Sequence, residues 1–202
     1  MWKVIGIPLV LYFIFALYIY QPVPTVDAAV AELIEDMPID TVLQYIELNY
    51  TLAVQEMQRA KIPASITLGQ AILESKYGTS ELAMQANNHF GIKAEAKWDS
   101  TDRHCIYSYE WNQKKQRMYP MLSCFRRYKN IQASYIGHSN FLVQRAHYMP
   151  LFALDIYDFE AWAHGLQKVG YATDPNYANK LISIIQRYQL YRYDKKEVLI
   201  ES

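Results

Sequence analysis

The chain has 202 residues, and its 20 Lys and Arg residues are balanced by 20 Asp and Glu residues. This length allows one folded domain with a sizeable core and a short appendage. A balanced charge without a basic stripe argues against a nucleic-acid partner. The 18 tyrosines and four tryptophans are typical of an aromatic core. They also suit sugar binding, because aromatic rings stack on sugar CH groups while tyrosine hydroxyls form hydrogen bonds.

The N-terminal segment differs in composition from the rest of the chain. Residues 4–20 carry no charge and are mostly apolar or aromatic. A basic residue before this stretch and small residues around Ala29 are typical of a secretory signal. The length of the stretch, with Tyr18 and Tyr20 near its end, also fits a membrane anchor. We therefore expect residues 1–27 to be a signal peptide or a membrane anchor. The folded part is then exported: anchored in the inner membrane facing the periplasm, or periplasmic or secreted after cleavage.

Helical periodicity predicts three helices in the first half of the folded part. Apolar residues recur at three- and four-residue spacing over residues 36–60, with Asp40 as the expected N-cap. A second helix is expected over residues 65–76, with Gly78 as its terminator. A short helix follows over residues 80–86.

The helical pattern then gives way to alternating polar and aromatic residues at 106–111, a polar stretch at 112–115 and a return run at 118–125. This arrangement predicts a β-hairpin with a polar tip. Cys105 and Cys124 lie nineteen positions apart in this region, and in an exported protein one disulfide is expected to join them. Two cysteines and scattered histidines offer too few ligands for a zinc site, so we expect no metal and no other cofactor.

Three further helices are expected over residues 131–145, 158–169 and 175–191. The last has Asp174 as its expected N-cap and Pro175 in its first turn. The chain from Asp194 onward is expected to fray. Helices around one small hairpin predict a mainly α fold of the α+β type, with one domain over residues 36–194 and a tail at 195–202.

Glu74 is the candidate general acid. It lies near the end of an apolar helical run and precedes the polar loop at residues 87–91. No Lys or Arg occupies the helical positions three or four residues away. A carboxylic acid in apolar surroundings keeps its proton near neutral pH, because burial raises its pKa. The alternative is an ordinary solvated glutamate on an amphipathic helix.

Acid-catalysed cleavage of a glycosidic bond usually needs a second carboxylate, which activates water or stabilises the transition state. Glu110, on the first arm of the predicted hairpin, is the candidate. Glu95, Asp99 and Asp102 are nearby rivals. The separation between the two carboxyl groups distinguishes inverting from retaining enzymes, and the sequence does not contain it.

The segment GYATDPNYA, residues 170–178, is the second cluster of interest. A Gly that stops one helix, an exposed Tyr171 and an Asp-Pro pair that starts the next helix would hold this tyrosine rigidly at the edge of a cleft. The alternative is that these residues only end one helix and start the next.

The run PASITLGQAILESKYGTSELAMQANNHFGIK and the later GYATDPNYANKL resemble the glucosaminidase domain of glycoside hydrolase family 73, over about residues 40–193. The resemblance implies a lysozyme-like, mostly helical fold with a β-lobe. It also implies hydrolysis of the β-1,4 bond between N-acetylglucosamine and N-acetylmuramic acid in peptidoglycan. The family's acid falls on Glu74, its second acidic residue lies closest to Glu110, and its motif aromatic falls on Tyr171. The substrate-binding candidates that accompany them are Asn87, Asn88, Phe90, Tyr77 and Tyr177.

The sequence therefore predicts an exported, monomeric endo-β-N-acetylglucosaminidase that acts on peptidoglycan glycan strands, with no nucleic-acid partner. If the acetamido group of the substrate takes part, Tyr171 and Asn88 would orient it and Glu110 would be dispensable. Two other functions stay open. A lytic transglycosylase would use the same fold and acid but leave an anhydro-muramyl end, and a non-catalytic peptidoglycan-binding protein would release no fragments.

Overall fold

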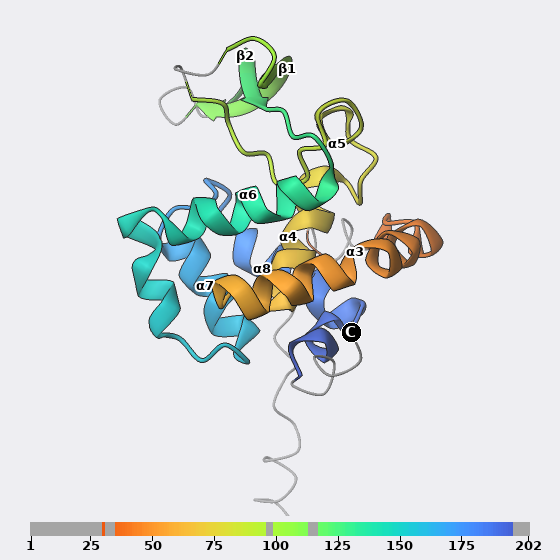
Figure 1. Ribbon diagram of the computed structural model, residues 1–202, viewed down its shortest axis with the longest axis vertical. Helices are drawn as coiled ribbons and strands as arrows, with labels where there is room; N and C mark the ends of the chain where they lie inside the picture. Colours follow the sequence, from red (N-terminus) through yellow and green to blue (C-terminus); the bar gives the residue numbers. More distant parts are fainter. Residues whose placement is uncertain (1–29, 31–34, 96–98, 113–116, 196–202) are drawn as a thin grey trace, which may run out of the picture.

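The structure is a computed structural model that describes residue 30 and residues 35–95, 99–112 and 117–195, with only the backbone described at 108–112 and 117–119. In chain order the elements are α3 (Ile39–Ala60), α4 (Ala64–Ser75), α5 (Glu81–Ala86), β1 (Arg103–Asn112), β2 (Arg117–Arg126), α6 (Ile131–Val143), the 3₁₀ helix η1 (Ala146–Ala153), α7 (Phe159–Lys168), α8 (Tyr177–Arg187) and the 3₁₀ helix η2 (Leu190–Asp194). The predicted mainly helical fold with a small hairpin is confirmed. The helices form one body, and the antiparallel β1–β2 sheet stands above it in Figure 1.

Helix α4 lies in the middle of the helical body and is buried from Ala64 to Ile72. It packs against α3, α7, α8 and η2, and α3 and α6 cross in front of it in Figure 1. Its approach to α8 is close because Gly69 has no side chain: a Cβ there would lie 2.7 Å from Leu181 Cδ1. A helix that is apolar on every side belongs in a core. The core therefore fixes the position of Glu74 at the far end of this helix.

Two helix ends differ from the sequence predictions. Helix α3 follows Pro38, so Asp40 lies in its first turn and is not its N-cap. Helix α4 ends at Ser75, because Lys76 already has a left-handed conformation with φ of 51° and donates its N–H to the carbonyl of Ile72. The expected terminator, Gly78, comes two residues later and is also left-handed. Non-glycine residues seldom adopt this conformation, so the earlier ending could not be predicted from the residue types.

Helix α8 begins at Tyr177 and not at Pro175. Asp174 accepts hydrogen bonds from the backbone N–H of Asn176 at 2.9 Å and from Nζ of Lys180 at 2.7 Å. An aspartate that binds the backbone two residues later forms a local turn. Asp174 therefore closes the turn before α8, and the prediction that it is the N-cap is wrong.

The 3₁₀ helix η2, at the end of the described residues, is part of the core. Asp194, predicted to begin a frayed tail, is buried, and its Oδ1 accepts a hydrogen bond from the backbone N–H of Ser65 at 2.8 Å. The first N–H groups of a helix need partners, and the residue before α4 is Pro63, which has no capping group. The 3₁₀ helix η2 thus supplies the cap for α4. The two 3₁₀ helices escaped the sequence analysis because they are short and have no 3.6-residue period.

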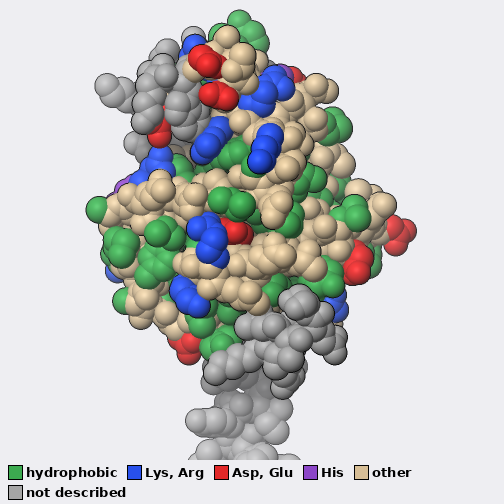
Figure 2. Space-filling model, in the orientation of Figure 1, with side chains coloured by type: hydrophobic (Ala, Val, Ile, Leu, Met, Phe, Trp, Pro, Cys, Tyr) green, Lys and Arg blue, Asp and Glu red, His purple; other side chains and the backbone are tan. Residues whose placement is uncertain are grey.

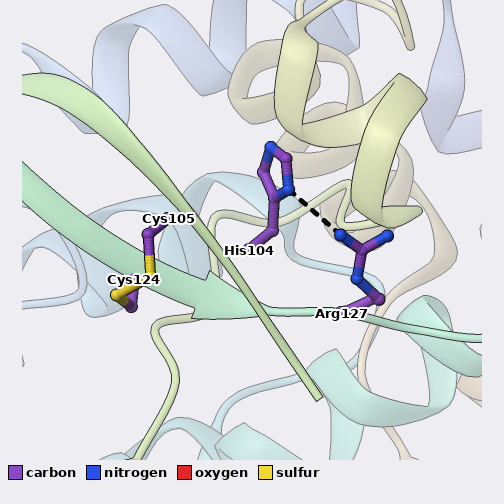
Figure 3. Close-up of a disulfide and its surroundings, with 4 residues drawn as sticks. All are labelled: His104, Cys105, Cys124 and Arg127. Atoms are coloured by element: carbon purple, nitrogen blue, oxygen red, sulfur yellow. Dashed lines mark hydrogen bonds between the residues drawn. A yellow bond between two sulfur atoms is a disulfide. The ribbon is translucent and has the colours of Figure 1, made fainter. Parts of the chain in front are cut away.

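The structure contains the predicted hairpin. Cys105 pairs with Cys124 across the two strands, and a disulfide joins them (Figure 3). The polar tip expected at residues 112–115 lies mostly outside the described residues, since the structure omits 113–116. The strands extend further toward their base than predicted, to Arg103 and Arg126.

Side chains at the base of the hairpin attach it to α5. Arg127 donates from Nη2 to His104 Nδ1 at 3.2 Å, as Figure 3 shows, and from Nη1 to the carbonyl of Gln85 at 2.8 Å. Because arginine can only donate, His104 Nδ1 must accept, and the imidazole proton therefore lies on Nε2. That nitrogen is 3.4 Å from Oε1 of Glu81. These contacts hold the hairpin in a defined place beside α5.

The N-terminal expectation concerns residues that the structure does not describe. Residues 1–27, predicted to be a signal peptide or a membrane anchor, lie outside the described residues. Within the part that is described, no helix has the length and apolar character needed to cross a membrane. Val30 is fully buried in the main core.

Candidate active site

Glu74 lies at the C-terminal end of α4, next to the last helical residue, Ser75. Its side chain is partly exposed, whereas Ile72 and Ser75 are buried. Gly91 of the polar loop lies close to this side chain: a Cβ at this position would lie 3.8 Å from Glu74 Oε2. The loop therefore lies against the carboxyl group at a residue that has no side chain.

Burial controls the protonation of Glu74. It raises the pKa of this carboxyl group from 4.5 to about 7, against the smaller lowering effect of a hydrogen bond from Tyr177. A general acid works best when its pKa lies near the operating pH, since it must hold a proton and also release it. Glu74 meets this requirement at neutral pH.

Tyr177 is buried, and Gln70 orients its hydroxyl group. Gln70 Nε2 donates to the Tyr177 oxygen at 2.8 Å. An amide nitrogen can only donate, so the phenolic proton remains available for Glu74. Gln70 precedes Glu74 by four residues on α4 and thus lies on the same face of the helix. Gln70 was not among the predicted site residues, although its spacing of four residues from the predicted acid was a usable signal.

Tyr171 lies deeper than predicted. It was expected to be exposed at a cleft edge, but the residue is partly buried and its enclosed hydroxyl has no hydrogen-bond partner among the described residues. Its ring contacts the rings of four residues, His138, Phe141, Tyr148 and Tyr177. Burial raises its pKa far above 10, and the nearby Tyr177 and Glu74 raise it further. The hydroxyl thus stays protonated, close enough to Glu74 for the two groups to interact electrostatically.

The asparagines of the polar loop hold the loop together. Asn88 is buried, and its Nδ2 donates to the carbonyls of Ile92 at 2.9 Å and Arg126 at 2.8 Å. Its Oδ1 accepts from the backbone N–H of Ile92 at 3.2 Å. Asn87 Nδ2 donates to the carbonyl of Tyr128 at 3.0 Å. Both amides therefore form hydrogen bonds with the backbone and hold the loop in place.

Two histidines that the sequence analysis did not single out support the loop. Phe90 is buried and stacks on His138 at 4.1 Å between ring centroids. His89, in the middle of the loop, shares a 2.7 Å hydrogen bond between its Nδ1 and the hydroxyl of Tyr45. Burial lowers the pKa of His89 to about 4 and that of His138 to about 3. Both are neutral at pH 7, which suits packing and not proton transfer.

Glu110 lies in β1 opposite Tyr119. The Glu110 side chain lies outside the description, so its role remains a prediction.

The other predicted residues are less central. Glu95 is exposed and lies 4.0 Å from Arg145. Asp99 accepts hydrogen bonds from the turn that follows it, including the N–H of Asp102, and these bonds lower its pKa. Tyr77 follows α4 in a left-handed conformation and packs partly against the core. Among the described residues, no group of three or more His, Cys, Asp or Glu side chains is placed to hold a metal ion.

A helical body, a small hairpin and one carboxylic acid of raised pKa at the end of a central helix are typical of lysozyme-like glycoside hydrolases. Comparison with known proteins gives the family. The model of the glucosaminidase family, described as mannosyl-glycoprotein endo-beta-N-acetylglucosaminidase, matches residues 50–190. The chain belongs to this family, and the resemblance noted in the sequence is confirmed.

Individual relatives agree with this assignment. The chain is 36% identical over 143 residues to the exo-glucosaminidase LytG of Bacillus subtilis, which covers 68% of this chain and 48% of LytG. A C-terminally truncated glycoside hydrolase domain of Salmonella typhimurium FlgJ has a TM-score of 0.57 at 28% identity, over 72% of this chain and 96% of that domain. The catalytic domain of the Listeria monocytogenes autolysin Auto shares the fold, with a TM-score of 0.63 at 24% identity, over 95% and 100% of the two chains. The chain spans half or less of the length of the curated relatives it matches.

Proposed function

We propose that this chain is an exported peptidoglycan hydrolase that cleaves the β-1,4 bond between N-acetylglucosamine and N-acetylmuramic acid. The observation that carries the proposal is Glu74, a partly buried carboxyl group whose pKa of about 7 suits a general acid. Membership of the glucosaminidase family supports the type of bond. Relatives named exo-glucosaminidase and peptidoglycan hydrolase support the substrate.

In the proposed reaction, protonated Glu74 gives its proton to the glycosidic oxygen of the leaving sugar. The hydrogen bond from Tyr177 then stabilises the carboxylate that forms. Tyr171 is the proposed partner of the acetamido group or of the attacking water, and this role requires its enclosed hydroxyl to become accessible when the substrate binds. Glu110 activates that water if the water attacks directly, whereas participation of the acetamido group removes the need for a second carboxylate.

We further propose cleavage within the glycan strand, as the description of the family indicates. LytG is named an exo-enzyme, so the two modes must be separated by experiment. Release of long glycan fragments early in the digestion indicates endo cleavage, and steady release of single sugars indicates exo cleavage. Residues 1–27 are proposed to carry the chain out of the cytoplasm or to anchor it in the inner membrane. Residues 36–194 are proposed to act as a monomer on the wall.

The test is digestion of purified peptidoglycan with residues 28–202, followed by borohydride reduction and mass spectrometry of the released fragments. Reduced N-acetylglucosamine ends are the expected product. Anhydro-muramyl ends would instead assign the chain to the lytic transglycosylases, again with Glu74 as the acid. A folded protein that binds the wall but releases no fragments would be a binding protein.

The first prediction concerns the acid itself. Glu74→Gln keeps the size of the side chain but cannot donate a proton, so we expect product release to fall by at least about 100-fold, the usual range for a lost general acid. Glu47→Gln, at an exposed position on α3, is the matched control and should keep full activity. Substantial activity in the Glu74 variant would refute the assignment of the acid.

A further inference from the structure

Two arginine side chains lie on aromatic rings close to the proposed site. The guanidinium carbon of Arg126 is 4.8 Å from the centre of the Tyr128 ring, and that of Arg145 is 3.8 Å from the centre of the Phe141 ring. Both arginines are partly exposed. A guanidinium group held against a ring has fewer orientations to lose when it binds an anion.

The backbone ties Arg126 to the loop beside Glu74. The N–H of Arg126 donates to the carbonyl of Ile92 at 2.9 Å, and its own carbonyl accepts from Asn88 at 2.8 Å. Ile92 directly follows Gly91, the residue that lies against the Glu74 carboxyl group. Arg126 is therefore paired with the loop segment that borders the acid.

The positive charges of both arginines also act on one tyrosine near the proposed site, Tyr128. Burial raises the pKa of Tyr128, and the positive charges of Arg126 and Arg145 act against this rise. Tyr128 in turn lies near Tyr171, whose pKa also reflects the nearby Glu74. The charges of both guanidinium groups therefore act on the Tyr128 hydroxyl. Tyr128 lies near Tyr171, which in turn lies near Glu74.

Arg145 reaches the site by a second route. The Phe141 ring on which it stacks lies 6.5 Å from the ring of Tyr171, edge to face. Arg145 also donates from Nη1 to the carbonyl of Phe141 at 3.2 Å, which fixes the direction of its side chain. One aromatic ring therefore separates this charge from Tyr171.

Basic side chains lie near the proposed site although the net charge of the chain is zero. Lys93, on the strand-like segment that pairs with Phe125, adds a third positive charge. Glu95 is 4.0 Å from Arg145 Nη2, and an exposed pair at this distance is weak. Figure 2 shows Lys and Arg side chains gathered on the visible face between the hairpin and the helices. Such a region attracts anions.

We propose that Arg126 and Arg145 bind a carboxylate group carried by the glycan, beside the bond that Glu74 protonates. The inference rests on the proposed function and deepens it. The planar guanidinium group matches a carboxylate with two parallel hydrogen bonds. In peptidoglycan this carboxylate belongs either to the lactyl group of the muramyl sugar, where the stem peptide is missing, or to the stem peptide. A chitin-type chain has the same β-1,4 linkage and no carboxylate, so the two arginines distinguish wall glycan from chitin.

The test measures binding by calorimetry, with the Glu74→Gln chain to prevent turnover. The three ligands are a peptide-bearing glycan fragment, the same fragment without peptide, and a chitin-type oligosaccharide of equal length. We expect Arg126→Gln and Arg145→Gln, singly and together, to weaken binding of a carboxylate ligand by about tenfold and to reduce its salt dependence. Loss confined to the peptide-bearing fragment identifies the stem peptide, and loss on the peptide-free fragment identifies the lactyl group.

Arg192→Gln is the matched control. Arg192 also lies 4.8 Å from a tyrosine ring, that of Tyr193, but it belongs to η2, which packs at the opposite end of α4 from Glu74. Its removal should leave all three affinities unchanged, and Arg145→Lys should restore less than the full affinity because lysine cannot bind a carboxylate with two parallel bonds. Thermal unfolding of each variant confirms the fold.

Two results would overturn the inference: unchanged affinity in the double variant, or an equal loss on the chitin-type ligand. The proposed function fails separately. If the wild-type chain binds carboxylate-bearing glycan through the arginines but releases no fragments, the hydrolase proposal is wrong and the binding inference stands. If it cleaves peptidoglycan while the arginine variants bind as the parent does, only the inference is lost.

Discussion

At the scale of single residues, burial and a hydrogen bond have opposite effects on the pKa of Glu74. Burial at the end of an apolar helix raises its pKa, and the Tyr177 hydroxyl lowers it. Glu74 lies in the last turn of α4, where the free backbone carbonyls carry a partial negative charge. This charge also disfavours a carboxylate there. The balance at a pKa of about 7 leaves a proton on Glu74 under neutral conditions.

The contact between Tyr177 and Glu74 can be tested by its effect on pH dependence. In Tyr177→Phe the hydrogen bond that stabilises the Glu74 carboxylate is lost, so the pKa of Glu74 rises. Activity requires protonated Glu74, and the alkaline decline of kcat/KM should therefore move to higher pH. The measurement is a pH–rate profile of the variant and the wild-type chain.

Tyr50→Phe serves as the control for this profile, because Tyr50 stacks on Tyr193 at the end of the body where η2 lies. Its profile should match that of the wild-type chain. An alkaline limb that stays in place or moves to lower pH in Tyr177→Phe would contradict the assignment of Tyr177 as a donor to Glu74.

At the scale of elements, α4 connects two distant parts of the chain. Its first turn is capped by Asp194 from η2, and its last turn carries Glu74. A helix of 12 residues is about 18 Å long, so η2 holds one end of the helix whose other end carries the acid. The cap comes from a different element because proline precedes the helix.

Removal of this cap should lower stability. Asp194→Ala leaves the N–H of Ser65 without its partner, and the expected loss in the free energy of unfolding is about 1–2 kcal/mol, as for other N-caps. Urea unfolding near pH 3.5 is suitable. Burial raises the pKa of Asp194 to about 6, so at this pH the carboxyl group is mostly protonated in the folded and unfolded states, and the cost of burying its charge does not oppose the loss of the cap. Asp40→Ala, in the first turn of α3, should cost about 0.5 kcal/mol or less. Equal losses in the two variants would show that Asp194 is not the cap.

At the scale of the whole molecule, the proposed acid reduces stability. The pKa of Glu74 is raised in the folded state from 4.5 to about 7, so the folded chain holds this proton more tightly than the unfolded chain. Below about pH 4.5 the group is protonated in both states and has no effect. Between pH 4.5 and 7 the unfolded state alone loses the proton, and stability falls as the pH rises.

Glu74→Gln should therefore stabilise the protein at pH 8 by about 1–3 kcal/mol and change little near pH 4, because glutamine never takes the charge. The estimate allows for partial exposure of the side chain to solvent. Urea unfolding of the wild-type chain and the variant at the two pH values provides the measurement. A gain that is the same at both pH values would show that the charge of Glu74 is not its source.

The local pattern was enough to place most elements and the proposed acid. Helices α5, α6 and α7 and the hairpin lie close to their predicted ranges, because periodicity and turn residues act within a few positions of each other. Glu74 was found by the same means, from an apolar run that ends in a carboxylate. Neither kind of signal shows how deeply a side chain is buried. Tyr171 was accordingly expected to be exposed, and it is partly buried. The contact of Asn88 with substrate stays a prediction.

By itself, the sequence determined that this protein has a mainly helical body with one hairpin, and that Glu74 ends an apolar helix before a polar loop. Only the tertiary structure decided which residues surround that acid. Asp194 reaches Ser65 across 129 positions, and Asn88 closes its loop onto Arg126 across 38. Hydrogen bonds and burial of this kind depend on contacts between segments far apart in the chain. A local pattern therefore predicts an element and its chemistry, whereas long-range packing decides which side chains support the site and which remain available to bind.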